Sequence, residues 1–109
     1  MKTFLSNAFS LNMLSGDGML NVTESSPDGV PKDAISCIGH ESTAVVAGAL
    51  LGQDVAVNRV AVSLARGDVI YVITLFDSLG KPYRAPEGVT LGQDELLALR
   101  LVIRRVEVL

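Results

Sequence analysis

The one histidine of this chain is its best candidate for acid–base chemistry. His40 lies in the pentapeptide GHEST (39–43), directly before an apolar stretch that predicts a helix over residues 43–51. The first turn of a helix has unpaired N–H groups and the positive end of the helix dipole, so it attracts anions. Ser42 and Thr43 would add hydroxyl donors there. A surface histidine near a helix cap would show the same pattern, so the residues alone leave both interpretations open.

Two arginines have the fork-shaped guanidinium that holds a phosphate by paired hydrogen bonds. Arg59 follows Asn58 at the start of a predicted strand, and Arg84 lies in a predicted loop shortly before Glu87. The carboxylate of Glu87 could assist a proton transfer, although an exposed glutamate is the commoner case. Polar side chains also follow the first predicted strand, where turn formers are common: Asn7, Ser10 and Asn12.

Cysteine and histidine are too scarce for a metal site of the usual nitrogen and sulfur kind. Such a site needs three or four of these ligands, and the chain has only Cys37 and His40. We therefore expect no metal, no other cofactor and no disulfide within the chain. Cys37 lies in an apolar stretch and is expected to be a core thiol. The patterns of phosphate-binding loops, dinucleotide-binding folds and serine nucleophile elbows do not occur.

Composition argues against several classes of protein. A length of 109 residues predicts one domain over residues 1–109, and 49% hydrophobic against 19% charged residues is typical of a folded globular chain. The net charge of −3 disfavours a protein that coats DNA or RNA, which needs a positive surface. No apolar run approaches the roughly 18 residues of a membrane helix. The first residues turn polar too early for a signal peptide, so we expect a cytoplasmic protein without membrane contact.

Alternating apolar residues predict several strands. The first begins at Lys2 and breaks near Asn7, and two more are expected over 19–23 and 33–38, joined by a hairpin-type turn at 25–29. Further strands are predicted over 59–64 and 104–109. The run 69–76 is almost wholly apolar and is expected at the centre of the sheet, followed by a long loop over 77–88.

Two helices are predicted between these strands. The first, over 43–51, has Gly52 at its C-terminal cap and Ser42 or its neighbour at its N-cap, with one apolar face made of Val45, Val46, Ala49 and Leu50. The second covers 91–99, where Thr90 and Gln93 have the spacing of a capping box. This order of elements predicts an α/β domain with a central mixed sheet flanked by helices.

Four motifs in sequence resemble one known family. They are FLSNAFSLNML (4–14), IGHEST (38–43), NRV (58–60) and RAPEG (84–88). Together they are similar to the type III CRISPR ring nucleases of the viral anti-CRISPR kind and their cellular relatives, long catalogued as a domain of unknown function. The resemblance covers nearly the whole chain. One departure is the segment DSLGKP (77–82), which looks like extra length before Arg84 and leaves the geometry of that loop open.

The resemblance implies a homodimer that binds cyclic tetra-adenylate between its subunits. It implies cleavage of that ring to linear di-adenylates without metal, which switches off type III CRISPR signalling. By position, His40 matches the catalytic histidine of the family's motif, and Glu87 matches the catalytic glutamate of its R-x-x-E-G loop. The positions implied to bind substrate are Asn7, Ser10, Asn12, Ser42, Thr43, Arg59 and Arg84.

The chemistry of RNA cleavage is compatible with these residues. A ribose 2′-hydroxyl can attack the adjacent phosphate and leave a 2′,3′-cyclic phosphate, and the departing 5′-oxygen then needs a proton from an acid such as His40. A two-fold dimer would supply one such acid for each of two opposing bonds of the ring. Two alternatives remain: a small dimeric nucleic-acid-binding or regulatory protein, and a module that binds a cyclic nucleotide without cutting it. The missing basic stripe disfavours stable binding of duplex nucleic acid.

Overall fold

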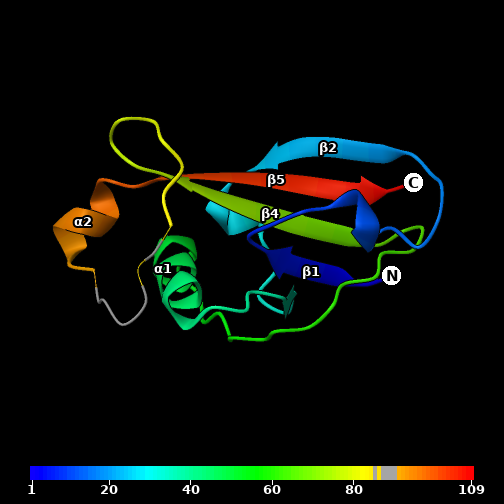
Figure 1. Cartoon of the computed structure of the whole chain (residues 1–109), viewed down its shortest axis with the longest axis horizontal. Helices are drawn as coiled ribbons and strands as arrows, with labels where there is room; N and C mark the ends of the chain where they lie inside the picture. The colour runs from blue at the N-terminus through cyan, green and yellow to red at the C-terminus, as the bar shows by residue number, and fades with distance from the viewer. Residues whose placement is uncertain (85, 87–90) are drawn as a thin grey trace.

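A mixed β-sheet runs through the part of the chain that the computed structural model describes, which is residues 1–84, 86 and 91–109. Its five strands among these residues lie in the order β2-β5-β4-β1-β3 (Figure 1). In chain order the strands are β1 (Thr3–Ser6), β2 (Leu20–Ser25), β3 (Ile35–Ser36), β4 (Val69–Phe76) and β5 (Arg100–Val108). β1 is parallel to β3 and β4, whereas β5 is antiparallel to β4 and β2. The expected central mixed sheet is confirmed.

β4 lies at the centre of the sheet, as its apolar sequence predicts, because such a strand suits a position covered on both faces. It pairs with β5 along its whole length, up to Phe76 opposite Arg100. β1 pairs only with the first half of β4 and ends with Ser6 opposite Val72. The second half of β4 therefore extends beyond the end of β1. This step in the sheet leaves room beside β4 for the segment that follows β1.

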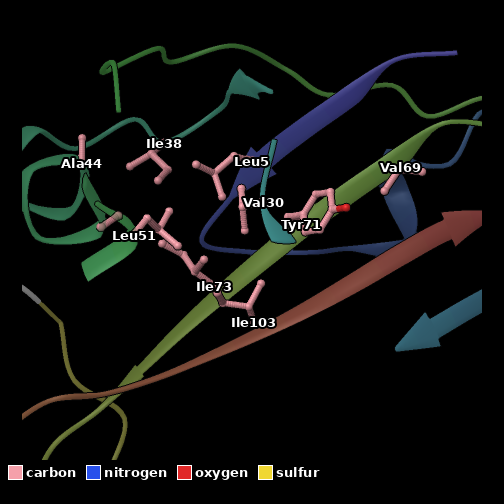
Figure 2. Close-up of a cluster of buried hydrophobic side chains, with 10 residues drawn as sticks. Leu5, Val30, Ile38, Ala44, Leu51, Val69, Tyr71, Ile73 and Ile103 are labelled. Carbon is pink, nitrogen blue, oxygen red and sulfur yellow. The ribbon is translucent and has the colours of Figure 1, made fainter. Parts of the chain in front are cut away.

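Helix α1 (Glu41–Leu51) packs against one face of the sheet and covers β1 and β4. Figure 2 shows the core that results, with Ala44 and Leu51 of the helix close to Ile38, Ile73 and the strand β1. Ala44 and Ala47 are fully buried in this core, together with the larger Leu51.

The buried face of α1 differs from the predicted one. Its buried residues are Thr43, Ala44, Val46, Ala47 and Leu51. Val46 is common to both sets, but Val45 is 59% exposed and Ala49 is also exposed. Leu50 is partly buried and packs against the cluster around Val46 and Leu75, so the prediction was wrong for Val45 and Ala49 only. Val45 and Ala49 consequently form an apolar strip on the outer side of the helix.

The opposite face of the sheet is covered by loops and a short 3₁₀ helix, η1 (Leu11–Met13). Phe4, Ile70 and Val106 are buried there against Leu64. The strand predicted over 59–64 is wrong, because only Leu64 makes a ladder contact, an isolated bridge to Leu14. Residues 59–64 run to this face and pack Leu64 onto it instead of joining the sheet edge.

β3 is shorter than predicted and has a different partner. The predicted strand over 33–38 is reduced to Ile35–Ser36, which pairs in parallel with β1. β2 pairs with β5, so the expected hairpin between the second and third strands is wrong. The residues between them form a 3₁₀ turn, η2 (Pro27–Gly29), that turns the chain away from β2. The turn itself was predicted correctly from its residues, but the strand with which β2 pairs is far along the sequence and could not be predicted locally.

The second helix, α2 (Gln93–Leu97), is shorter at both ends than the predicted 91–99, and β5 follows it at Arg100. The Glu95 carboxylate accepts a hydrogen bond from the backbone N–H of Gly92 at 3.3 Å and caps the helix. The predicted capping box of Thr90 and Gln93 is wrong, because Gly92 is the N-cap and Gln93 is the first residue of the helix; Thr90 itself lies outside the described residues. Over the described part of the chain, no helix combines the length and apolar character needed to cross a membrane.

Candidate functional site

The carboxyl ends of three parallel strands meet at one end of the sheet. β1 ends at Ser6 and continues into Asn7, β3 leads into the segment before His40, and β4 ends at Phe76. Helix α1 begins at this same end (Figure 1). In open α/β sheets, ligands bind outside the carboxyl ends of the strands. The topology therefore gathers several of the sequence-predicted residues where a ligand site is expected.

His40 is the N-cap residue of α1, a position that the sequence prediction gave to Ser42 or its neighbour. The backbone of His40 is extended (φ −119°), and its carbonyl oxygen accepts the hydrogen bond of the Ala44 N–H at 3.0 Å. Its imidazole does not cap the helix. Ser42 and Thr43 both fall in the first turn, where backbone N–H groups lack helical partners. The half-buried histidine thus stands directly at the anion-attracting end of α1.

Arg59 is held beside this histidine by its neighbour in the sequence. Its guanidinium donates a hydrogen bond to the carbonyl oxygen of Gly39 at 3.3 Å. The preceding residue, Asn58, donates its backbone N–H to the carbonyl oxygen of Ile38 at 2.8 Å and its side-chain amide to that of Ser36 at 2.7 Å. These bonds fasten the segment to the end of β3. They place an exposed cation next to the N-terminus of α1.

Two glycines make this return of the chain possible. Gly52 ends α1 in the left-handed conformation (φ 71°), as its predicted role at the cap requires. A Cβ atom on Gly48 would lie 2.8 Å from the carbonyl oxygen of Gln53, so the chain passes directly over this glycine as it turns back. After this reversal, residues 53–59 run back along the helix toward β3, and Arg59 reaches the carbonyl oxygen of Gly39.

The loop after β4 is organised by one aspartate. The Asp77 carboxylate accepts hydrogen bonds from the backbone N–H groups of Leu79 and Lys81, both at 2.9 Å. Gly80 has a φ of 78°, which glycine adopts without strain. The segment 77–82, the extra length noted in the sequence, therefore forms a tight turn. Pro82 then bridges to Phe76 and the chain returns along the end of β4.

A cavity of about 110 Å³ opens where these elements meet. Its lining combines polar, apolar and aromatic side chains from β4, α1, the end of β1 and the returning loop: Asn7, Thr43, Ile73, Thr74, Leu75, Pro82, Tyr83 and Arg84. Three of these, Asn7, Thr43 and Arg84, are among the sequence-predicted binding residues. None of the eight is acidic, so the cavity suits a neutral or anionic ligand.

The sequence prediction missed two polar residues of this cavity. Thr74 interrupts the otherwise apolar second half of β4, and a lone hydroxyl in a central strand is a signal that could have pointed to a site. Tyr83 stands directly before Arg84 and could have been grouped with it. Neither residue was predicted, because β4 was interpreted as a buried central strand and only Arg84 and Glu87 of the following loop were assigned a role.

His40, Ser42 and Arg59 do not line this cavity and lie instead at the N-terminus of α1, and Ser10 and Asn12 are not brought to it either. The hydroxyl of Ser10 accepts a hydrogen bond from the Asn12 N–H at 3.2 Å and so caps the helix η1. Asn12 is exposed on that helix. Both residues thus have the turn-forming role that was the commoner expectation for such positions. Glu87, the second expected catalytic residue, lies outside the described residues.

Cys37 has the properties of a structural thiol. It is half-buried against the core on the η1 face, and its Sγ donates to the carbonyl oxygen of Ile35 at 3.6 Å. Burial raises the pKa of the Cys37 thiol, which disfavours the reactive thiolate. In the described part of the chain, no three histidine, cysteine, aspartate or glutamate side chains gather in a group that could hold a metal ion.

Comparison with known proteins places the chain in a family. The STIV B116-like family model matches residues 3–103. Among solved structures, the chain is similar to B116 of Sulfolobus turreted icosahedral virus, with 27% sequence identity and a TM-score of 0.74. That match covers 98% of this chain and 99% of the viral protein. No curated protein matches. The family match spans nearly the whole sequence and the structural match the whole fold, and the chain belongs to the STIV B116-like family.

Proposed function

We propose that this protein is a metal-independent ring nuclease that cuts cyclic tetra-adenylate to linear di-adenylates ending in a 2′,3′-cyclic phosphate. The observation that carries the proposal is the meeting of predicted residues at one end of the sheet. Asn7, Thr43 and Arg84 line one cavity, and His40 lies one helical turn from Thr43. The identity of the substrate is inferred from the motifs that resemble those of the ring nucleases.

The reaction needs an acid more than it needs a metal. The 2′-oxygen of one ribose attacks the neighbouring phosphorus, a new P–O2′ bond forms and the P–O5′ bond breaks. His40 donates its proton to the departing 5′-oxygen, and the 2′-hydroxyl loses its own proton to water or to a carboxylate. In this proposal Glu87 supports His40 in its role as the acid. A positioned acid of this kind contributes roughly 10²- to 10⁴-fold to a rate.

Three features of the site would hold the scissile phosphate in line. The first turn of α1 offers backbone N–H groups and the helix dipole. Arg59, fixed against Gly39, presents a cation at the same place. Arg84 presents a second cation from the returning loop. Positive charge is therefore local, which reconciles a net charge of −3 with a phosphodiester substrate.

The proposal includes a homodimer. Each chain has one histidine, whereas the ring must be opened at two opposing bonds to give two di-adenylates. A two-fold axis through the ring would present His40 of each copy to one of these bonds. Such an enzyme would act in the cytoplasm and end the signal that type III CRISPR defence sends through this messenger.

The test is incubation of the protein with cyclic tetra-adenylate in EDTA, with the products separated by chromatography. The proposal predicts linear di-adenylate in the chelator. Tight binding without any product would favour a module that only binds the ring. Duplex DNA bound as tightly as the ring at about 150 mM salt, where electrostatic contacts are already weakened, would favour a nucleic-acid-binding protein.

A further inference from the structure

We propose that Tyr83 determines the base specificity of the site, with its aromatic side chain packed against one adenine of the bound cyclic tetra-adenylate. This inference rests on the proposed function, because it identifies how that ligand is recognised. It concerns the part of the cavity that the sequence motifs do not cover. Three features of Tyr83 support this role: its backbone is bonded to β4, its side chain packs on the core, and polar side chains line the same cavity.

The backbone of Tyr83 is fixed to the end of β4. Its N–H donates to the carbonyl oxygen of Leu75 at 2.8 Å, and the preceding Pro82 bridges to Phe76. The turn organised by Asp77 leads directly into this pairing. Tyr83 is therefore an extension of the sheet and no free loop residue, so a ligand would meet a tyrosine whose position is already set.

The side chain of Tyr83 is supported by the core. It packs against a cluster around buried Val46 and Leu75, to which α2 contributes Leu96. The residue is half-buried and also lines the cavity. Tyr83 thus packs against aliphatic side chains and also borders the space where a ligand would lie. A supported aromatic surface loses little conformational entropy when a base packs on it.

The neighbours of Tyr83 match the parts of a nucleotide. The Asn7 amide and the Thr43 and Thr74 hydroxyls line the same cavity and can donate to or accept from the edge of a base. Arg84, the next residue in the chain, supplies a cation for the phosphate. Tyr83 is the one aromatic side chain among the lining residues of this cavity. Recognition of single-stranded RNA commonly combines these elements, an aromatic face for the base and polar groups for its edge.

Substitutions at Tyr83 separate stacking from packing. Tyr83→Phe keeps the ring, and we expect its affinity for cyclic tetra-adenylate to stay within about threefold of wild type. Tyr83→Leu keeps an apolar side chain against Leu75 but removes the ring, and its affinity should fall about 5- to 100-fold, as loss of one base stack does. If Tyr83→Leu fails to fold, Tyr83→Met serves the same purpose with a more adaptable side chain. Affinities are measured by calorimetry on the His40→Ala background, so that cyclic tetra-adenylate is not cleaved during the measurement.

A second readout reports specificity directly. Adenine stacks better than uracil, so wild type should prefer cyclic tetra-adenylate to cyclic tetra-uridylate, and the preference should shrink in Tyr83→Leu but persist in Tyr83→Phe. A purely structural role for Tyr83 would lower the affinity for both ligands equally.

Tyrosine fluorescence gives a third readout. The chain has two tyrosines and no tryptophan, and Tyr71 is buried. Tyrosine fluorescence should therefore fall when cyclic tetra-adenylate binds, and this decrease should be absent in Tyr83→Phe.

The outcomes distinguish this inference from the proposed function. Wild type that neither binds nor cuts cyclic tetra-adenylate would overturn both. Wild type that binds and cuts the ring, together with a Tyr83→Leu variant of unchanged affinity and unchanged base preference, would overturn the role of Tyr83 alone. A fluorescence change that persists in Tyr83→Phe would also overturn it, because the base would then lie elsewhere.

Discussion

The guanidinium of Arg59 donates to the carbonyl oxygen of Gly39, at 3.3 Å, and joins two segments that lie 20 residues apart in the sequence. A Cβ atom on Gly39 would stand 3.3 Å from the Nε atom of Arg59, so the glycine leaves the space in which the arginine lies. This contact puts a cation beside His40 and the first turn of α1. It holds Arg59 where the proposed function requires a phosphate ligand.

Replacement of Arg59 should weaken ligand binding without loss of the fold. Arg59→Ala is expected to lower the affinity for cyclic tetra-adenylate by about tenfold or more, the size of one hydrogen bond to a charged group. Arg59→Lys should recover only part of the loss, because an ammonium cannot form the paired bonds of a guanidinium. Arg66→Ala, at the other end of the sheet, is the matched control. Equal affinity of Arg59→Ala and Arg66→Ala would remove Arg59 from the site.

The turn after β4 should matter for binding more than for stability. Asp77→Ala removes the acceptor of the Leu79 and Lys81 N–H groups, so the returning loop that presents Tyr83 and Arg84 would need to be ordered by the ligand. We expect affinity for the ring to fall about two- to tenfold, the cost of ordering such side chains. Asp77→Asn keeps one acceptor oxygen and should lie closer to wild type. A melting temperature that falls while affinity stays constant would contradict this role.

Much of the scaffold could be predicted from local patterns. β1, β4 and α1 with its Gly52 cap follow from apolar runs and a glycine whose φ is positive, all of which are properties of neighbouring residues. The pairing of β2 with β5 could not be predicted, because it depends on the other strands of the finished sheet. The strand expected over 59–64 fails for a similar reason: Val60 is 48% exposed, and only the later residues of that alternation find a core to enter.

The site was predictable to a different degree. Asn7, Thr43 and Arg84 were identified by motifs and meet at one cavity. The contribution of Tyr83 depends on the turn organised by Asp77, whose direction of return is a property of the folded chain. Ser10 carries a hydroxyl like Thr43, which lines the cavity, but its hydroxyl caps η1. Residue type alone does not separate these two uses of a hydroxyl.

Gly48 should resist substitution although alanine is the better helix former. Gly48→Ala would gain about 1 kcal/mol of helix propensity, but its Cβ would stand 2.8 Å from a backbone oxygen of the returning chain. Overpacking of this kind costs about 1–3 kcal/mol, so we expect a net loss of stability in urea unfolding. Gly16→Ala is the control, because a Cβ there meets no atom within 4 Å and the φ of Gly16 is not positive. A Gly48→Ala variant at least as stable as Gly16→Ala would contradict the close passage of the chain over Gly48.

Asp68 should make the free energy of unfolding depend on pH in the acidic range. Its buried carboxylate accepts hydrogen bonds from the backbone N–H groups of Ala65, at 3.0 Å, and Lys2, at 2.9 Å, and these bonds hold the pKa of Asp68 below its usual range. Because the folded pKa is lowered, the contribution to stability is complete above the ordinary pKa of an aspartate. It is lost as the pH falls through the folded value.

Asp68→Asn should therefore lower the free energy of unfolding at neutral pH by about 1–3 kcal/mol and show a flatter decline toward acid than wild type. Urea unfolding of both proteins from neutral pH down to about pH 2 gives the comparison. Parallel curves for the two proteins would show that Asp68 does not titrate with folding.

The most direct measurement is single-turnover cleavage of radiolabelled cyclic tetra-adenylate in EDTA by wild type and His40→Ala, with ring binding measured on the same preparations. If His40 donates the proton to the departing 5′-oxygen, His40→Ala should cut at least about a hundredfold more slowly. Its affinity for the ring should stay within about threefold of wild type, because Arg59, Arg84 and the N-terminus of α1 still hold the phosphates. A variant that binds and cuts like wild type would contradict the assignment of His40 as the acid and the mechanism built on it.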